Sequence, residues 1–456
     1  METSPQMKIP SDLRGVIDSG MCTACGACLA ADPGLDLEMD PSKLVYRPTG
    51  VGDERAAGVC PAIAVDFPWL HSKVFPGRQV TPHGVVDSVL LAQSTDIDRN
   101  LKASSGGLIK EMLAELLLRS DIDGVIALDE VAGLEYRERL VTDIEDVDRL
   151  PGSIYHAVRL DDTLRILREQ PGRYVLVGIP CQFEGLYTYI HRHEPELADR
   201  IALTVGLLCG WLYSHHSIRA ISQYKKVDPD DITHIAYRGG GPVGKLRMVT
   251  PERTVTVGRR VDFSYQVAFD RSFNNTRCHV CVNHSNFLAD IVVGDAWLPS
   301  TVTTRSGISL LICRTPEARS LVDDLEDSGR IVLTEASVEE ITESQTHRVV
   351  FGDFAYAYAD YRRALGLHTP DMFGPNHAET RPAAEDAVAH FHKELMRKQE
   401  LQARGDYRFL WWRKATKELP RHLKKYLDWF LVRVLRIKSL KGERQELSRD
   451  DMAVFR

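Results

Sequence analysis

The sequence predicts an α+β protein with a cysteine-rich N-terminal domain, a central mixed α/β domain and a basic helical tail. Three observations lead to this fold class. Four of the nine cysteines lie before residue 61, strand-like and helix-like patterns alternate from about residue 85, and positive charge gathers after residue 392. At roughly 100–200 residues per domain, 456 residues suit two or three domains. We place them at 1–80, 81–350 and 351–456.

The N-terminal domain is predicted from the spacing of its cysteines. Cys22, Cys25 and Cys28 recur at every third position, and Cys60 follows later, directly before a proline. The run resembles the C-x2-C-x2-C run of bacterial ferredoxins, in which a cysteine before a proline is also a ligand. The alternatives are free thiols or a zinc site, but zinc sites usually pair their ligands as two C-x2-4-C units. The spacing therefore favours a [4Fe–4S] cluster in a ferredoxin-like domain.

The central domain is predicted from alternating strand and helix patterns. Apolar residues at i, i+3, i+4 and i+7 indicate an amphipathic helix at 108–120. Short apolar runs on either side of it indicate strands, and this alternation argues for an α/β core. Strands are expected at 85–94, 123–130, 173–180, 200–210, 290–297 and 308–315, with further helices at 163–170 and 318–329.

A second group of cysteines lies in the central domain. Cys278 and Cys281 form one C-x2-C pair, whereas Cys181 and Cys209 each follow an apolar run that is typical of a buried strand. Four thiols from three segments suffice for a second cluster. By spacing alone, Cys181 and Cys209 are equally compatible with core thiols, because free cysteine is often buried. Cys313 lies within an apolar strand pattern, so we expect it to pack in the core.

Two segments of the central domain carry signals for an anionic ligand. Ser104 and Ser105 are candidate caps for the helix at 108–120, and Gly106 and Gly107 would let a ligand approach its N-terminus. A plain serine cap followed by close-packed glycines is the alternative. Asp295 follows an apolar strand and a glycine, where it would either bind a ribose or ring nitrogen or cap the next turn. The Gly-rich basic segment at 237–245 is expected to be a turn rather than a phosphate site.

Taken together, the motifs resemble the family of coenzyme F420 hydrogenase/dehydrogenase beta subunits, which includes the F420-reducing hydrogenase beta subunit and 7-hydroxymethyl chlorophyll a reductase. The motifs appear in the family's order between about residues 20 and 300. They are CTACGAC at 22–28, CP at 60–61, ASSGG at 103–107, PGSIY at 151–155, GIPCQ at 178–182, Cys209, CHVC at 278–281 and GDAW at 294–297. The chain departs from the family's pattern at Ile154, where a polar residue such as Lys is expected.

The resemblance implies that FAD and two [4Fe–4S] clusters are bound. The first cluster would use Cys22, Cys25, Cys28 and Cys60, and the second Cys181, Cys209, Cys278 and Cys281. The central domain would then be a flavin-binding domain. Its site would be lined by Ser104, Ser105, Gly106, Gly107, Gly152, Ser153, Tyr155 and Asp295. No residue stands out as a catalytic proton donor, and His156, in the 151–155 loop region, is expected to be structural or solvent-facing.

The function implied is that of an oxidoreductase. Electrons would pass between ferredoxin, or reduced coenzyme F420, and an organic substrate through the clusters and FAD. The alternative is a non-catalytic electron-transfer subunit of a larger redox complex, with a link to cell-envelope polysaccharide biosynthesis. A zinc-stapled interaction module is a third class.

Charge and hydropathy bound the partners and the location. The net charge of −7 does not favour nucleic-acid binding. The absence of an apolar leader or an 18-residue apolar run, together with nine cysteines, predicts a reducing, cytoplasmic setting. The basic amphipathic segment at 390–440 would either contact a membrane surface peripherally or pack on the body or a partner. An oligomeric assembly is compatible with these features.

Overall fold

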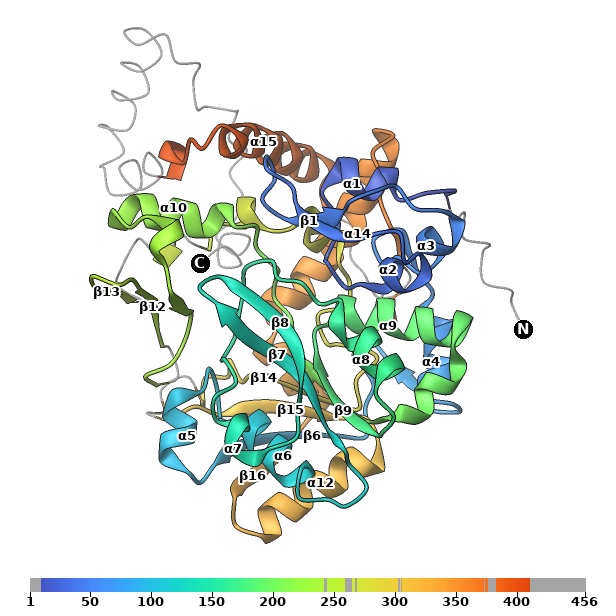
Figure 1. The fold of residues 1–456 in the computed structure, drawn as a ribbon, viewed down its shortest axis with the longest axis vertical. Coiled ribbons are helices and arrows are strands. Elements are labelled where there is room, and N and C mark those ends of the chain that lie inside the picture. Colours follow the sequence, from blue (N-terminus) through green and yellow to red (C-terminus); the bar gives the residue numbers. More distant parts are fainter. Residues whose placement is uncertain are drawn as a thin grey trace, which may run out of the picture.

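The computed structural model describes residues 10–241, 244–258, 265–266, 269–301, 304, 306–372, 374–375 and 383–410. A mixed eight-stranded sheet forms its centre (Figure 1). The predicted alternation of strands and helices in the central region is thereby confirmed. In spatial order the strands are β16 (Ile331–Ala336), β6 (Ser88–Ser94), β15 (Ser309–Cys313), β14 (Ile291–Asp295), β10 (Ile201–Leu207), β9 (Tyr174–Gly178), β7 (Gly124–Ala132) and β8 (Glu135–Val141).

The middle of the sheet is parallel and its edges are antiparallel. Strands β7, β9, β10 and β14 run in one direction, whereas β8, β15 and β16 pair antiparallel with their neighbours. Parallel strands end at the same edge of a sheet, and ligand sites of open α/β sheets lie outside these carboxyl ends. A ligand site is therefore expected at the carboxyl ends of β9, β10 and β14.

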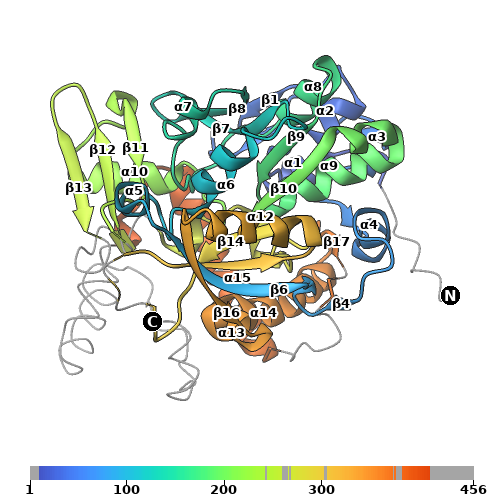
Figure 2. The ribbon, with the colours of Figure 1, turned by 90° about the horizontal axis from the view of Figure 1, so that it is seen from below.

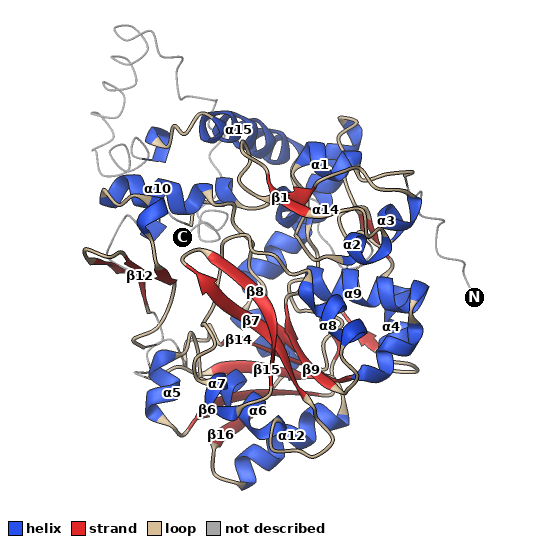
Figure 3. Cartoon of the chain, viewed as in Figure 1, coloured by secondary structure: helices blue, strands red, loops and turns tan. Residues whose placement is uncertain are grey.

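Helices cover both faces of the sheet (Figures 2 and 3). One face packs on α6 (Leu108–Leu116) and α12 (Pro316–Asp327), and the other on α4 (Phe67–Val74), α8 (Asp162–Glu169) and α9 (Pro180–His193). Alternate strand residues serve opposite faces, so Val125 packs with α6 while Ile126 packs with α9. Cys313 is fully buried among the core residues of β15, as expected.

The N-terminal region shares a core with helices from the end of the described chain. Its elements are α1 (Arg14–Ser19), α2 (Ala27–Ala31), β1 (Leu37–Met39), β2 (Tyr46–Pro48) and α3 (Glu54–Gly58). Leu13 and Val16 pack in one hydrophobic cluster with Tyr358 of α14 (Thr346–Ala364) and Leu395 of α15 (Glu385–Ala403). Figure 1 shows α1 (blue) beside α14 (orange) and α15 (dark red). The predicted division at 80 and 350 stays a prediction.

The remaining elements surround this body. They are β3 (Ala64–Val65) with β17 (Asp371–Met372), β4 (Val80–Thr81) with β5 (Gly84–Val85), α5 (Ile97–Lys102), α7 (Ile144–Val147), α10 (His216–Lys225), α13 (Val338–Ser344), and a small sheet of β11 (His234–Ala236), β12 (Lys245–Val249) and β13 (Thr254–Gly258). Among the described residues, no helix is both long and apolar enough to span a membrane. Of the basic segment predicted at 390–440, residues 411–440 lie outside the described part of the chain.

Candidate cofactor site

The first cysteine group lines one pocket. Cys22, Cys25, Cys28 and Cys60 all face it, together with apolar residues of α1 and the 60–62 turn. The loop that carries three of them turns at Gly26, whose φ of 76° lies in the left-handed region that glycine adopts readily, and α2 starts directly after it. The turn at Gly26 therefore brings three thiols to one pocket, and the separate 60–62 segment adds Cys60.

The surroundings of these thiols suit a positively charged cofactor core. Burial raises the pKa of Cys25 to about 12 and that of Cys60 to about 11, and for Cys25 the nearby Cys60 adds to the rise. Backbone N–H groups oppose it: the amide of Ala24 donates to Cys22 Sγ at 3.3 Å. Four buried thiols are stable as thiolates only beside a strong positive charge, which the irons of a cluster would supply.

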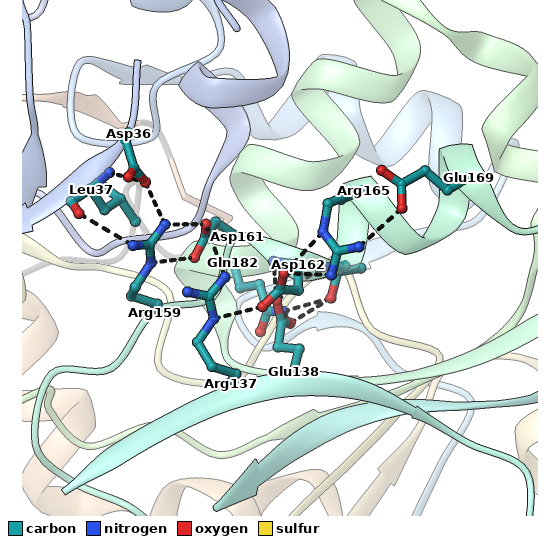
Figure 4. Close-up of polar contacts among 11 residues, drawn as sticks. Asp36, Leu37, Arg137, Glu138, Arg159, Asp161, Asp162, Arg165, Glu169 and Gln182 are labelled. Atoms are coloured by element: carbon teal, nitrogen blue, oxygen red, sulfur yellow. Dashed lines mark hydrogen bonds and ion pairs between the residues drawn. The ribbon is translucent and has the colours of Figure 1, made fainter. Parts of the chain in front are cut away.

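The loop of the first group is fixed to the central sheet by the segment before α8. Arg159 donates to Asp36 at 2.6 Å and to Asp161 at 2.8 Å, as Figure 4 shows. The amide of Leu160 donates to the carbonyl of Ala24 at 2.9 Å. A β-carbon on Gly26 would lie 2.4 Å from Cα of Asp161, so this contact requires glycine. The loop is thus held against the body by backbone contact at Ala24 and Gly26, and the ion pair of Arg159 holds the nearby Asp36 segment.

The second cysteine group begins at the carboxyl ends of the parallel strands. In register, Gly178 of β9 pairs with Gly206 of β10, which pairs with Val292 of β14. The residues three positions further along are Cys181, Cys209 and Asp295. Two predicted cluster ligands therefore lie just past the ends of β9 and β10, and one predicted flavin contact is the last residue of the next strand, β14.

The C-x2-C pair lies beside these strand ends. Cys278 belongs to the 3-10 turn Thr276–Val280, and Cys281 follows it. Cys278 accepts a hydrogen bond from the amide of Leu212 at 3.4 Å, three residues after Cys209. Burial raises the pKa of Cys181 and Cys278 to about 12, and both thiols interact electrostatically with Cys281. The structure thus brings Cys181, Cys278 and Cys281 together and places Cys209 on the segment that contacts Cys278.

The predicted flavin loops also meet one another. The Ser153 hydroxyl donates to Ser104 Oγ at 2.8 Å, which joins the 103–107 loop to the 151–155 loop. The Ser105 hydroxyl donates to the carbonyl of Ile308 at 2.9 Å, and Gly106 N donates to Ser309 Oγ at 2.9 Å. Gly152 is exposed beside Ser104. These loops lie next to the end of β14, which carries Asp295.

Arg238 joins the three flavin-loop segments, and the sequence reasoning missed it. Its guanidinium pairs with both oxygens of Asp295, at 2.9 and 3.0 Å. It also donates to the carbonyl of Ser104 and, at 3.4 Å, to the hydroxyl of Tyr155. The arginine side chain is only 2% exposed. The one sequence feature that could have indicated Arg238 is the run of three glycines that follows it. These glycines let the segment approach Leu101, and Gly240 N donates to the Leu101 carbonyl at 2.9 Å.

Two details of the sequence reasoning change. Ser104 and Ser105 do not cap α6, because Gly107, with a φ of 82°, takes the cap position without a side-chain hydrogen bond. Of the two expected roles of His156, structural or solvent-facing, the structure shows the structural one, because the side chain is fully buried. Its ring nitrogens bond to Tyr237 Oη at 2.7 Å and to the Leu134 carbonyl at 2.9 Å.

Each group offers four cysteines, which is the number and kind of ligands that a [4Fe–4S] cluster takes. A cubane binds its four cysteines through separate irons, so the sulfurs surround it. A zinc ion needs four ligands around one centre, about 2.3 Å from each sulfur. Within the described ranges, no three His, Cys, Asp or Glu side chains are arranged around a single metal position.

Two sequence models of one family match the centre of the chain. The N-terminal model of the coenzyme F420 hydrogenase/dehydrogenase beta subunit matches residues 89–165, and the C-terminal model of the same subunit matches residues 172–339. These ranges span nearly all of the eight-stranded sheet and include the second cysteine group and the flavin loops.

Individual proteins are similar over longer stretches. The chain is 24% identical over 342 residues to a protein of Methanosarcina mazei that is named as a subunit of the F(420)H(2) dehydrogenase, and the match covers 71% of this chain and 88% of the relative. It is 22% identical over 267 residues to the coenzyme F420 hydrogenase subunit beta of Methanococcus voltae, covering 57% of this chain and 88% of the relative.

The fold also matches a solved structure. A chain of the F420-reducing [NiFe] hydrogenase complex from Methanosarcina barkeri superposes with a TM-score of 0.50 at 18% identity. The match covers 64% of this chain and 98% of the other. This likeness is one of fold.

Proposed function

The chain belongs to the family of coenzyme F420 hydrogenase/dehydrogenase beta subunits, and from this premise we propose that it is an iron–sulfur flavoprotein oxidoreductase. Its substrates would be reduced F420 or ferredoxin on one side and an organic molecule on the other. A flavin accepts an electron pair as hydride and releases single electrons, which clusters carry one at a time. The chain would thereby connect a two-electron couple to one-electron carriers.

One observation carries the proposal: the order of the sites across the sheet. Gly185 of α9 lies against Cys25 of the first group, and Cys181 lies in the first turn of the same helix. Cys181 and Cys209 follow the neighbouring strands β9 and β10, and Asp295 is the last residue of the next strand, β14. The first group, the second group and the flavin loops are thus adjacent in that order. This order is the one an electron path between a surface carrier and a flavin requires.

The residues proposed for each cofactor suit it. Each cluster would have four cysteine ligands, with the amide of Ala24 donating to a sulfur of the first. The loops that carry Ser104, Gly152 and Asp295 would hold FAD, and the backbone at Gly152 is open, since a β-carbon there would meet Ser104 Oγ at 3.6 Å. Arg238 would hold the loops from Ser104, Tyr155 and Asp295 in place around it.

Anaerobic reduction with F420H2 tests the proposal. The protein, reconstituted with iron, sulfide and FAD, should lose flavin absorbance on addition of F420H2 and then show the electron paramagnetic resonance of reduced [4Fe–4S] clusters. Ferredoxin reduced by dithionite serves as the second donor. If the reconstituted protein retains no flavin, or if neither donor reduces it, the proposed activity is wrong.

A second candidate function rests on the relatives' names. The similar proteins from Methanosarcina mazei and Methanococcus voltae are named as subunits of a dehydrogenase and a hydrogenase. By analogy, this chain would pass electrons to or from a separate catalytic protein. Isolated protein that reduces its clusters with F420H2 but turns over only when a partner is added would favour this role.

A further inference from the structure

A buried ion pair lies between the two cysteine groups. Arg277 donates to the carboxylate of Glu184, and the two side chains are 2% and 0% exposed. Asn283 Nδ2 donates to the other oxygen of Glu184 at 2.8 Å. Removing two charges from water is unfavourable, and their mutual attraction offsets this only in part. The position of the pair therefore calls for a reason other than stability.

Arg277 reaches both groups through direct contacts. Its Nε donates to the carbonyl of Pro61, directly after Cys60 of the first group, at 3.1 Å. Its Nη1 donates to Cys281 Sγ of the second group at 3.6 Å. One guanidinium thus holds a backbone segment of the first site and a sulfur of the second.

Arg277 carries a permanent positive charge, because a guanidinium is effectively always protonated in proteins. Its contacts with the Pro61 carbonyl and with Cys281 Sγ place that charge beside both cysteine groups.

Helix α9 places the carboxylate of the pair between the same two groups. Cys181, Glu184 and Gly185 are spaced i, i+3 and i+4, so they lie on one face of the helix. Gly185 contacts Cys25 of the first group: a β-carbon there would lie 2.9 Å from its sulfur. Cys181 and Gly185 are separated by about 6 Å along the helix axis. Glu184 therefore lies between a ligand of the second group and a ligand of the first.

Charge matters in this place because clusters with four thiolates are negatively charged and become more negative when reduced. Their reduction potentials respond to nearby charge and to hydrogen bonds on the sulfurs. In a dry interior, electrostatic interactions are only weakly screened, so reduction of one cluster opposes reduction of the other. A cation between them favours the reduced state of both.

We infer that Arg277 is a positioning residue that sets the potentials of both clusters together, and that Glu184 limits its effect. This inference rests on the proposed function, because it requires both clusters to be present. The arginine holds the Cys60–Pro61 segment and Cys281 at fixed distances from one charge, and the glutamate offsets part of that charge. A change at Arg277 would therefore shift the reduction potentials of both clusters, not of one alone.

Redox titration followed by electron paramagnetic resonance tests the inference on the reconstituted full chain. Arg277→Met should make both midpoint potentials more negative by at least about 59 mV, which corresponds to a tenfold change in the one-electron reduction equilibrium. Glu184→Gln should shift both in the opposite direction, and Arg277→Lys should lie between Arg277→Met and the parent. The matched control is Arg314→Met. Arg314 is also fully buried, but it donates to the carbonyls of His83 and Ser285.

The outcomes separate the inference from the proposed function. If the parent protein holds fewer than two clusters by iron analysis, the proposed function fails first. If it holds two and Arg277→Met shifts one potential only, or shifts both no more than Arg314→Met does, the inference is wrong. Should Arg277→Met lose its clusters, Glu184→Gln carries the test: unchanged or more negative potentials in that variant would overturn the inference.

Discussion

The first cysteine group lies on one loop and a following turn, whereas the second is assembled from three segments that meet at the end of a sheet. Cys22, Cys25 and Cys28 share a seven-residue stretch and line a pocket with Cys60. Cys181 and Cys209 instead follow neighbouring parallel strands. In a local loop, the spacing of the cysteines in the sequence determines where the ligands lie. At the strand ends, the order of the strands in the sheet determines it. The two groups should therefore respond differently to mutation.

The largest expected effect is the loss of a cluster. Cys28→Ala and Cys181→Ala should each remove about half of the iron, which is about four irons per chain. Cys28→Ala should also lower the unfolding temperature of the N-terminal region, because Cys28 and Cys60 belong to its hydrophobic core and cluster binding contributes to folding. Cys181→Ala should leave the body stable, since the sheet holds β9 without the ligand.

Iron analysis and thermal unfolding of the same samples check this difference. Cys313→Ala is the control, because that thiol is buried within β15 and should change no iron content. Equal loss of thermal stability in Cys28→Ala and Cys181→Ala would contradict the distinction between a loop site and a strand-end site.

The next effect concerns the flavin side of the second group. Arg238→Met breaks the ion pair between a buried arginine and the partly exposed Asp295, which should cost about 1–3 kcal/mol of unfolding free energy. It should also release FAD while both clusters remain, because Arg238 bonds to Ser104, Tyr155 and Asp295 of the flavin loops. Arg165→Met, which removes ion pairs of a half-exposed arginine, should cost about 0–1 kcal/mol. Urea unfolding and flavin fluorescence of the filtrate measure the two effects. Retention of FAD by Arg238→Met at the parent's level would count against the assigned loops.

Sequence patterns predicted the first group and most of the sheet. Ligand spacing and hydrophobic periodicity are local, so Cys22 to Cys60, β6, α6 and β9 could be placed without a structure. The strand order is set by contacts far apart in the chain, so the placing of Cys181 and Cys209 at the ends of neighbouring strands could not be derived from spacing. The two buried arginines were missed for the same reason: neither Arg238 nor Arg277 shows its partner in the sequence, and an isolated arginine is usually a surface residue.

A smaller effect should single out the first group. Gly185→Ala places a β-carbon 2.9 Å from Cys25 Sγ and 3.1 Å from the β-carbon of Ala27. Such overpacking should cost about 1–3 kcal/mol and should disturb the first cluster more than the second. Gly58→Ala is the control, because its β-carbon would meet only Arg192 at 3.5 Å. The rate of cluster bleaching in air, followed for both variants, measures the effect. Equal rates in the two variants would mean that α9 does not press on the first site.

The smallest effect is a pH dependence on the side of the second group. Burial, with a contribution from His215, lowers the pKa of His156 to about 3. The backbone of His156 forms an isolated β-bridge with Tyr213, and Tyr213 forms another with Asn274, shortly before the C-x2-C pair. The pKa is about 6.5 in the unfolded chain, so as the pH falls below that value the unfolded state binds a proton that the folded state does not. Unfolding free energy should therefore fall by about 1.4 kcal/mol per pH unit from this histidine. His156→Gln should remove that part of the slope between about pH 6.5 and 5.5 in urea unfolding. An unchanged slope would show that His156 takes up a proton within the fold.

The central claim is that two groups of different construction each hold a [4Fe–4S] cluster. Mössbauer spectroscopy of the chain reconstituted with enriched iron, together with total iron, tests it most directly. We expect about eight irons per chain, all in [4Fe–4S] signals, and about four in both Cys28→Ala and Cys181→Ala. About four irons in the parent, unchanged in Cys181→Ala, would contradict it, because the strand-end cysteines would then hold no cluster.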